Sequence, residues 1–383
     1  MILRQFQGSD VSLYGMGCMR LPKLADAADD AGVDETAVQE MVDLALEEGV
    51  TYYDTAWGYH NGVSEGVMGR CLAKYPRESF YLADKFPGYD SANWGKHEEI
   101  FAEQLQRCQV SYFDFYLVHN VCEMNIDAYL DAEGRYGDVA YLKQMRDEGK
   151  IAHLGFSVHG NYDVMKAFLE KYGEWMEFVQ IQLNYIDYSF QDANRKLELA
   201  AEYGLPVIVM EPLRGGMLAR ATEAEEAQLR AQRPEMGVVG WAERYLQGFE
   251  QVFCILNGAS SLEQLRENLS YFEVEEPLGE GDLQVLSAMV SARLASGVEP
   301  CTACRYCTPH CPQGIDIPKL LKAYNEHKFT GGGFLVPMLI PTIPEGKRPK
   351  DCTACGSCAA VCPQGIDIPG TLAKLSAMFD GAF

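Results

Sequence analysis

The chain has 383 residues, a formal net charge of −23, 48% hydrophobic residues and 23% charged residues. This much apolar side chain excludes disorder as the main state, and the length suits one large barrel with an appended domain. The negative charge argues against a nucleic-acid-binding surface, which needs basic residues to displace counterions.

The acidity belongs to the first 300 residues. Residues 301–383 carry eight Lys and Arg and six Asp and Glu, a local charge of +2, which leaves −25 for residues 1–300. A solvated surface explains this charge better than a docking patch. No segment reaches the ~18 apolar residues that span a membrane, and the first eight residues contain no apolar signal core. We therefore expect a cytoplasmic protein without a membrane or nucleic-acid partner.

Short β-rich segments alternate with helical periods from residue 34 to about residue 256. The first helical face is formed by Val38, Met41, Val42, Ala45 and Leu46, spaced i, i+3, i+4, i+7 and i+8. The predicted strands are 12–17, 50–54, 80–83, 113–118, 151–157, 178–183, 206–210 and 252–256. The predicted helices between them include 67–74, 137–148, 162–172, 193–203 and 236–247. Eight strands, each followed by a helix-sized interval, predict parallel pairing and an α/β fold, a closed (β/α)8 TIM barrel.

Functional groups of such a barrel lie where the strands end and the loops begin. Ionisable residues interrupt the apolar runs at three successive strand ends, at Asp54, Lys85 and His119, and Tyr59 follows Asp54 by five residues. Each residue alone would more often be a helix cap or a satisfied hydrogen-bonding group. Together they predict a catalytic site.

These segments resemble the Asp/Tyr, Lys and His motifs of the aldo/keto reductases. The similar segments are Asp54-Thr55-Ala56-Trp57-Gly58-Tyr59 with Gly62-Val63-Ser64-Glu65 and Gly69, Ala83-Asp84-Lys85, and Leu117-Val118-His119. The resemblance implies NAD(P)H-dependent reduction of a carbonyl to an alcohol, or the reverse, with Tyr59 as general acid served by Lys85, Asp54 and His119. The chemistry agrees, because a free tyrosine with a pKa of ~10 is a weak acid unless a neighbouring ammonium favours its anion. A neutral histidine can hydrogen-bond the substrate oxygen.

The same resemblance implies a nicotinamide cofactor, NADP(H) with NAD(H) as the alternative. The residues implied are Gly17, Met19, Ser157, Gln180, Met210, Pro212, Leu213, Arg214, Gly258, Ser260, Ser261, Gln264 and Asn268. Residues 258–268 begin a helix whose N-terminus suits a phosphate, although an ordinary capped helix is the alternative. Two residues depart from the family pattern: Val158 replaces an amide, and Met210 replaces an aromatic ring. We find no flavin signature, so a flavin has no support from the sequence.

Thirteen cysteines divide into five scattered residues and two crowded runs. Cys18, Cys71, Cys108, Cys122 and Cys254 are predicted to be small core residues. The runs share the spacing Cys-x2-Cys-x2-Cys-x3-Cys-Pro, which is typical of ferredoxins with two four-iron clusters, where the fourth cysteine of each run binds the other cluster. One predicted ligand set is Cys301, Cys304, Cys307 and Cys362, and the other is Cys352, Cys355, Cys358 and Cys311. Zinc is the competing interpretation, but it typically uses two separated cysteine pairs.

The two runs form an internal repeat offset by 51 residues, in which Cys-Thr-Ala-Cys and Cys-Pro-Gln-Gly-Ile-Asp-Ile-Pro recur unchanged. Helical patterns follow at 319–327 and 370–379, with a turn-rich insert at 331–349. We therefore expect a barrel domain at 1–298 and a small, mostly helical ferredoxin-like domain with two [4Fe-4S] clusters at 299–383. The whole chain resembles aldo/keto reductases with such a C-terminal domain, mostly from anaerobes.

Three functions remain open. The first is a carbonyl reductase or alcohol dehydrogenase with a small-molecule substrate and clusters of structural or regulatory role. The second is an electron-transfer protein that couples the barrel-bound cofactor to an external ferredoxin or flavoprotein, and the third is a redox-sensing binding protein. Trp57, Phe86 and loop 120–136 are predicted to line an apolar pocket, with simple packing as the alternative for the two aromatic residues.

Overall fold

The computed structural model describes residues 1–122, 124–131, 134–295, 297–330, 336, 340 and 343–379. Most of the predicted insert at 331–349, and Glu123, Ala132 and Glu133 of the predicted pocket loop, lie outside these residues. The chain forms two compact units, Met1–Leu213 with Val239–Leu278 and Arg214–Val238 with Gly279–Phe383. The domain division at residue 298 stays a prediction.

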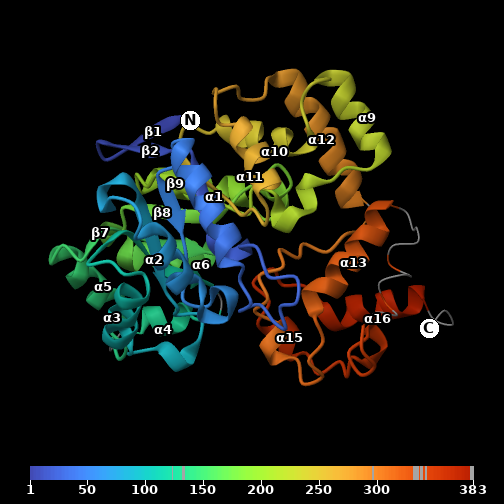
Figure 1. Cartoon of the computed structure of the whole chain (residues 1–383). Coiled ribbons are helices and arrows are strands. Elements are labelled where there is room, and N and C mark those ends of the chain that lie inside the picture. The colour runs from blue at the N-terminus through green and yellow to red at the C-terminus, as the bar shows by residue number, and fades with distance from the viewer. Residues whose placement is uncertain are drawn as a thin grey trace. The chain divides into compact units, whose positions relative to one another are not determined.

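A closed parallel barrel forms the first unit, with the strand order β10-β3-β4-β5-β6-β7-β8-β9 (Figure 1). Its strands are β3 (Tyr14–Gly17), β4 (Tyr52–Asp54), β5 (Tyr81–Phe86), β6 (Phe113–Val121), β7 (Ile151–Val158), β8 (Phe178–Gln182), β9 (Val207–Met210) and β10 (Val252–Asn257). Its α-helices are α1 (Glu35–Glu47), α2 (Ser64–Leu72), α3 (His97–Arg107), α4 (Ile126–Leu130), α5 (Asp138–Asp147), α6 (Tyr162–Tyr172), α7 (Asp187–Phe190), α8 (Ala193–Glu202), α10 (Val238–Gln247) and α11 (Leu262–Ser270). Short 3-10 helices are η1 (Cys18–Arg20), η2 (Tyr59–Gly62), η3 (Arg77–Ser79), η4 (Ser91–Asn93) and η5 (Gly173–Trp175). The predicted (β/α)8 barrel is confirmed.

An antiparallel hairpin that the sequence analysis did not predict precedes the barrel, with β1 (Leu3–Phe6) paired to β2 (Ser9–Ser12). Its turn residues Gln7 and Gly8 both have positive φ, 48° and 86°, as a two-residue hairpin turn requires. Ser12 therefore ends the hairpin, and the first barrel strand begins at Tyr14 rather than at residue 12.

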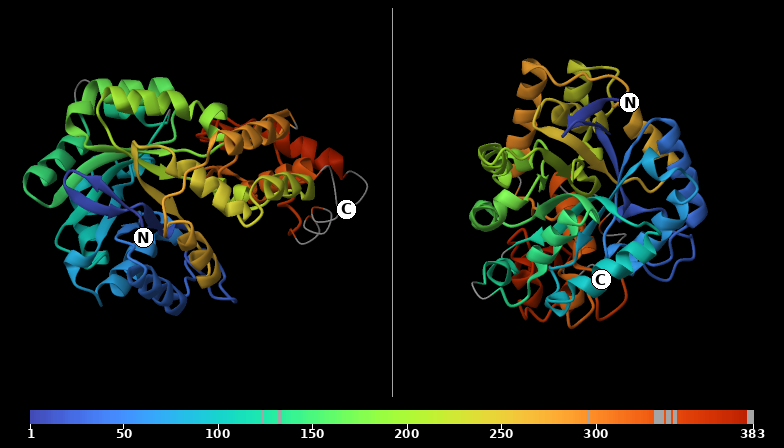
Figure 2. Two further views of the ribbon diagram at one scale, coloured as in Figure 1. Left: turned by 90° about the horizontal axis from the view of Figure 1, so that it is seen from above. Right: turned by 90° about the vertical axis from the view of Figure 1, so that its left-hand side faces the viewer.

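The hairpin closes the N-terminal end of the barrel. Phe6 stacks on Phe253 with ring centroids 4.5 Å apart and contacts Phe115 at 5.2 Å, and both partners lie near the start of their strands. Figure 2 shows the hairpin, in dark blue at the N-terminus, at one end of the barrel strands. The predicted site residues lie at the opposite end, where the strands lead into the loops that follow them.

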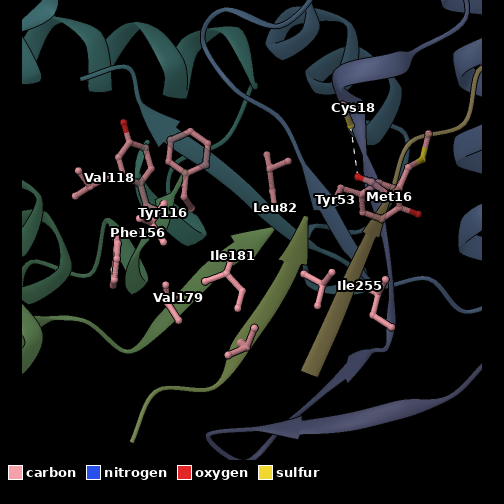
Figure 3. Close-up of a cluster of buried hydrophobic side chains, with 14 of the residues drawn as sticks. Met16, Cys18, Tyr53, Leu82, Tyr116, Val118, Phe156, Val179, Ile181 and Ile255 are labelled. Carbon is pink, nitrogen blue, oxygen red and sulfur yellow. Dashed lines mark hydrogen bonds between the residues drawn. The ribbon is translucent and has the colours of Figure 1, made fainter. Parts of the chain in front are cut away.

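Successive strand residues alternate between two apolar clusters. The inner cluster fills the barrel and contains Phe6, Val11, Tyr52, Ala83, Phe115, Leu117, Phe178, Ile208, Phe253, Cys254 and Leu256. The outer cluster packs under the helices, and Figure 3 labels its members Met16, Cys18, Tyr53, Leu82, Tyr116, Val118, Phe156, Val179, Ile181 and Ile255. The five scattered cysteines are all buried, as predicted.

The second unit is mostly helical. Its elements are η6 (Arg214–Ala219), α9 (Glu223–Gln232), α12 (Glu280–Ala295), η7 (Thr308–His310), α13 (Ile317–Thr330), η9 (Pro349–Asp351), α15 (Ser357–Ala360) and α16 (Ile368–Met378). Helices α13 and α16, at equivalent places of the internal repeat, lie side by side. Repeat-related residues share their core, among them Ile317 with Ile368 and Leu321 with Leu372. No described helix of either unit is long and apolar enough to cross a membrane.

Candidate active site and cluster sites

Three predicted catalytic side chains share the inner face of neighbouring strands. Asp54, Lys85 and His119 stand two residues beyond Tyr52, Ala83 and Leu117, which belong to the inner cluster of the barrel. The period of two places all three in the barrel interior at the C-terminal end of the strands. Strand β5 runs two residues past Ala83 to include Lys85, so the lysine is held by strand pairing.

Lys85 and Asp54 form a buried ion pair. Lys85 Nζ donates to Asp54 Oδ1 at 2.5 Å and to the carbonyl oxygen of Thr55 at 2.7 Å. Burial raises the pKa of Asp54, and attraction to Lys85 opposes that shift. Burial alone would lower the pKa of Lys85, but Asp54 and Tyr59 together outweigh burial and raise it. Lys85 is therefore a fixed positive charge at neutral pH.

Tyr59 begins η2, with Lys85 Nζ 5.0 Å from its ring centroid. Burial raises the pKa of Tyr59 to about 12, while Lys85 lowers it and Asp54 raises it. The lysine therefore acts in the expected direction, but burial is the larger effect. The phenol is protonated at neutral pH and can donate a proton.

His119 lies edge-on to two tyrosine rings. Its ring centroid is 6.1 Å from that of Tyr59 and 5.1 Å from that of Tyr89. Burial lowers the pKa of His119 well below its usual range, and the positive charge of Lys85 adds to the shift. The imidazole is therefore neutral, as predicted. Its Nδ1 is buried and has no partner among the described residues.

Tyr89 is a site residue that the sequence analysis missed. A side chain at Gly58 would overlap the Tyr89 hydroxyl, so the glycine lets Tyr89 lie where it does against the Tyr59 loop. The only signal in the sequence is an aromatic residue in the loop after β5, which is too common to select it.

A buried polar network connects helix α3 to strand β5, which carries Lys85. Glu65 accepts hydrogen bonds from Gln104 Nε2 at 2.9 Å and from Arg107 Nη1 at 2.8 Å. Gln104 Nε2 also donates to the carbonyl oxygen of Lys85 at 3.0 Å. Helix α3 thereby fixes the backbone of β5 at Lys85.

The two aromatic residues predicted to line the substrate pocket have packing partners. The Arg107 guanidinium lies 4.0 Å from the Trp57 ring centroid. Phe86 is fully buried in the outer cluster, away from the barrel interior. For Phe86 the packing alternative is therefore the correct one.

Residues predicted to contact the nicotinamide ring lie together on β7 and β8, where Ser157 and Gln180 are register partners. Gln180 is 3% exposed, and its Oε1 has no partner among the described residues. Ser157 Oγ accepts a hydrogen bond from the Asn120 N–H at 2.8 Å. A buried amide oxygen without a donor fits a ligand that carries an amide N–H. Gly17 ends β3, and Met19 is half-buried in η1.

Residues 258–268 form a capped helix start. Ser261 Oγ accepts from the Gln264 N–H at 3.3 Å, and Gln264 Oε1 accepts from the Ser260 N–H at 2.8 Å. Gly258, Ser260 and Gln264 are exposed, whereas Asn268 is buried in α11. The capped helix is present, and the predicted phosphate contacts at its N-terminus stay a prediction.

The predicted contacts after β9 fall in both units. Met210 and Leu213 are half-buried and Pro212 is buried in the first unit. Arg214 begins the second unit, where it lines a cavity of about 90 Å³. The charged residues of its lining are Arg214, Arg220, Arg293, Lys322 and Glu225, and Cys301 also borders it.

Four cysteines from both repeats line a second, much smaller cavity, namely Cys301, Cys304, Cys307 and Cys362. These are the residues predicted to hold the first cluster. Among the described residues, no three His, Cys, Asp or Glu side chains converge tightly enough to hold a single metal ion; the four cysteines surround a space instead. Burial raises the pKa of Cys307 to about 12, and repulsion from Cys301 and Cys362 adds to it. The donor set therefore fits a polynuclear cluster whose positive charge compensates the thiolates.

The second predicted ligand set is also assembled in part. Burial raises the pKa of Cys358, and repulsion from Cys352 and Cys311 raises it further, which places these three thiols near one another. Cys355 is exposed, and its Sγ donates to Ser357 Oγ at 3.6 Å.

Both cysteine loops use left-handed backbone at equivalent positions. Ala303 and Arg305 have φ of 58° and 66°, and their counterparts Ala354 and Gly356 have φ of 53° and 76°. Such turns direct successive N–H groups toward one point, as in known iron–sulfur sites. The Ala303 N–H donates to Cys301 Sγ at 3.4 Å.

Residues 15–287, most of the chain, match the aldo/keto reductase family model. The chain belongs to the aldo/keto reductase family. Residues 300–366 of this reductase match the 4Fe-4S dicluster domain, as the cysteine spacing predicts.

The aldo/keto reductase is 25% identical over 300 residues to the NADH-specific methylglyoxal reductase of Escherichia coli, an alignment that covers 66% of this chain and 88% of that one. It is 23% identical to an uncharacterized oxidoreductase of Bacillus subtilis, over 68% and 87% of the two chains. An aldo-keto reductase of Bacillus halodurans in its holo form superposes with a TM-score of 0.60 and 24% identity, over 76% and 96% of the two chains. One from Klebsiella pneumoniae in complex with NADPH has a TM-score of 0.59 and 18% identity, over 76% and 96%. These structures establish the barrel fold.

Proposed function

We propose that this aldo/keto reductase reduces a small aldehyde or ketone to an alcohol, or catalyses the reverse, with Tyr59 as general acid and base. One observation carries the proposal: a protonated Tyr59 and a neutral His119 stand beside the buried Lys85–Asp54 ion pair at the C-terminal end of the barrel strands. A nicotinamide cofactor, when bound, supplies the hydride.

The side chains divide the proton chemistry among them. Tyr59 donates its hydroxyl proton to the carbonyl oxygen as negative charge develops there. Lys85 stabilises the phenolate that is left, and Asp54 keeps the lysine charged and oriented. Neutral His119 donates a hydrogen bond from its ring to the same oxygen and sets its direction.

We infer that NADP(H) is the cofactor and keep NAD(H) as the alternative. The Klebsiella relative binds NADPH, while the Escherichia coli relative is NADH-specific. Ser157 and Gln180 would hold the carboxamide, and the start of α11 at Ser260 and Ser261 would face the phosphate.

We further propose that the C-terminal domain holds two [4Fe-4S] clusters, on the two ligand sets predicted from the sequence. An electron-transfer function, with an external ferredoxin or flavoprotein as partner, is the second candidate. The exposure of Cys355 favours it, because an exposed ligand brings the second cluster to the surface of its unit.

The test uses anaerobically purified protein with intact cluster absorbance and compares Tyr59→Phe with the control Tyr75→Phe, whose hydroxyl bonds Asp43 on the surface. Methylglyoxal and an aromatic aldehyde serve as carbonyl probes. We expect Tyr59→Phe to lower kcat by ~10²–10⁴ with NADPH binding unchanged. A Tyr59→Phe enzyme as active as the control would overturn the proposal.

The second candidate is tested by titrating the same protein with NADPH while recording electron paramagnetic resonance. Bleaching of the cluster absorbance with a new paramagnetic signal would support electron transfer. An unchanged spectrum with NADPH bound, and equal carbonyl turnover in a folded, cluster-free variant that carries both Cys304→Ala and Cys355→Ala, would count against it.

A further inference from the structure

Strand β6 carries a bulge beside the catalytic histidine. Val118 and Val121 both pack in the outer cluster, and the pairing with β7 shifts register between them. Two residues three positions apart cannot face the same side of a regular strand, so the bulge inserts one extra residue. His119 and Asn120 lie between the two valines, at the register shift.

The backbone of Asn120 is fixed in the left-handed region, which few residues other than glycine and asparagine adopt. Its φ is +55°. Two hydrogen bonds hold it: its N–H donates to Ser157 Oγ at 2.8 Å, and its carbonyl oxygen accepts from Asn125 Nδ2 at 2.9 Å. The chain therefore maintains a left-handed residue next to two predicted site residues, which is where such backbone is commonly found.

The side chain of Asn120 is fully buried without a hydrogen-bond partner. Its exposure is 0%, and neither Oδ1 nor Nδ2 has a partner among the described residues. An unsatisfied buried polar group lowers the stability of the folded protein. A ligand that offers both a donor and an acceptor would remove this cost.

We propose that Asn120 binds the carboxamide of the nicotinamide ring, together with Ser157 and Gln180. This inference rests on the proposed nicotinamide-dependent function. It explains the departure at Val158, whose apolar side chain packs in the outer cluster and offers no hydrogen bond. Asn120 Nδ2 donates to the carboxamide oxygen, and the carboxamide N–H groups are accepted by Gln180 Oε1 and Asn120 Oδ1. The amide absent at position 158 is thus supplied by the neighbouring strand, which pairs Val121 with Val158.

Asn120→Gly is the informative variant, because glycine adopts a φ of +55° without strain and only the side chain is lost. Gln109→Gly is the matched control, since Gln109 is exposed with a φ of 56° and lies away from the site. Dissociation constants are measured without turnover, by tryptophan fluorescence, for NADP⁺ and for its 3-acetylpyridine analogue, in which a methyl group replaces the carboxamide NH2. Steady-state kinetics with the carbonyl probe complete the set.

We expect Asn120→Gly to weaken NADP⁺ binding roughly tenfold, the loss of about 1.4 kcal/mol. The preference of the wild type for NADP⁺ over the analogue should fall at least threefold, while Gln109→Gly leaves both constants unchanged. An Asn120→Gly protein with unchanged NADP⁺ affinity overturns the inference alone, and a raised KM for the carbonyl would then identify Asn120 as a substrate contact. A wild-type protein that binds neither nucleotide overturns the proposed function itself.

Discussion

The buried pair of Asp54 and Lys85 makes a quantitative prediction for a double-mutant cycle. Their charged atoms are 2.5 Å apart, and the side chains are 3% and 0% exposed. At an effective dielectric constant of ~20, charges at this separation attract by about 7 kcal/mol, which desolvation largely offsets. Removing one partner leaves the other charge buried and unpaired, so Asp54→Asn and Lys85→Met should each destabilise the barrel by about 3–5 kcal/mol. The double variant should cost at least 2 kcal/mol less than the sum of the two, by the same argument.

Urea unfolding followed by tryptophan fluorescence measures this coupling in the first unit, because Trp57, Trp94, Trp175 and Trp241 all lie there. The exposed pair Glu35 and Arg70, 2.9 Å apart, is the control and should couple by less than about 1 kcal/mol. If the Asp54–Lys85 coupling is no larger than that of the surface pair, the two side chains do not form the buried ion pair on which the proton chemistry depends.

Three further outcomes are expected. Burial raises the pKa of Glu243 from 4.5 to about 8, so the folded protein binds a proton that the unfolded chain releases. Stability therefore falls as the pH rises from about 4.5 toward 8. Glu243→Gln should flatten the dependence of Tm on pH, and an unchanged slope would contradict the raised pKa. Gly356→Ala should lower stability by about 1–2 kcal/mol, because the φ at this position is positive, and should speed the loss of the cluster to a chelator. Arg305→Gly, at the equivalent position of the first repeat, should not speed that loss. Equal rates for the two variants would refute the role of the left-handed turn. Phe115→Ala, in the inner cluster, should cost about 3–5 kcal/mol in urea unfolding by tryptophan fluorescence, and a loss below 1 kcal/mol would show that the hairpin end is not close-packed.

The barrel could be predicted because its signals are local and repeated. Apolar periods and strand-like runs fix the element types, and the helix predicted at 162–172 has the bounds of α6. The hairpin was missed because Arg4 and Gln5 interrupt its apolar pattern. The aromatic partners of Phe6, Phe115 and Phe253, belong to strands far along the chain and meet it only in the folded barrel.

The same distinction explains the site. Asp54, Lys85 and His119 could be predicted because each breaks an apolar run at a strand end. Asn120 could not be predicted, because the bulge at this residue depends on how β6 pairs with β7 and has no signature in the sequence. The Glu65–Gln104 bond joins residues 39 positions apart, and no spacing rule connects them.

The cavity that unites cysteines of both repeats constrains when the domain can mature. Cys301, Cys304 and Cys307 leave the ribosome first, but the cavity is completed by Cys362, 55 residues after Cys307. The first run therefore lacks its fourth cysteine until the second repeat has been synthesised. A chain truncated before Cys362 would leave the first run of cysteines without that partner.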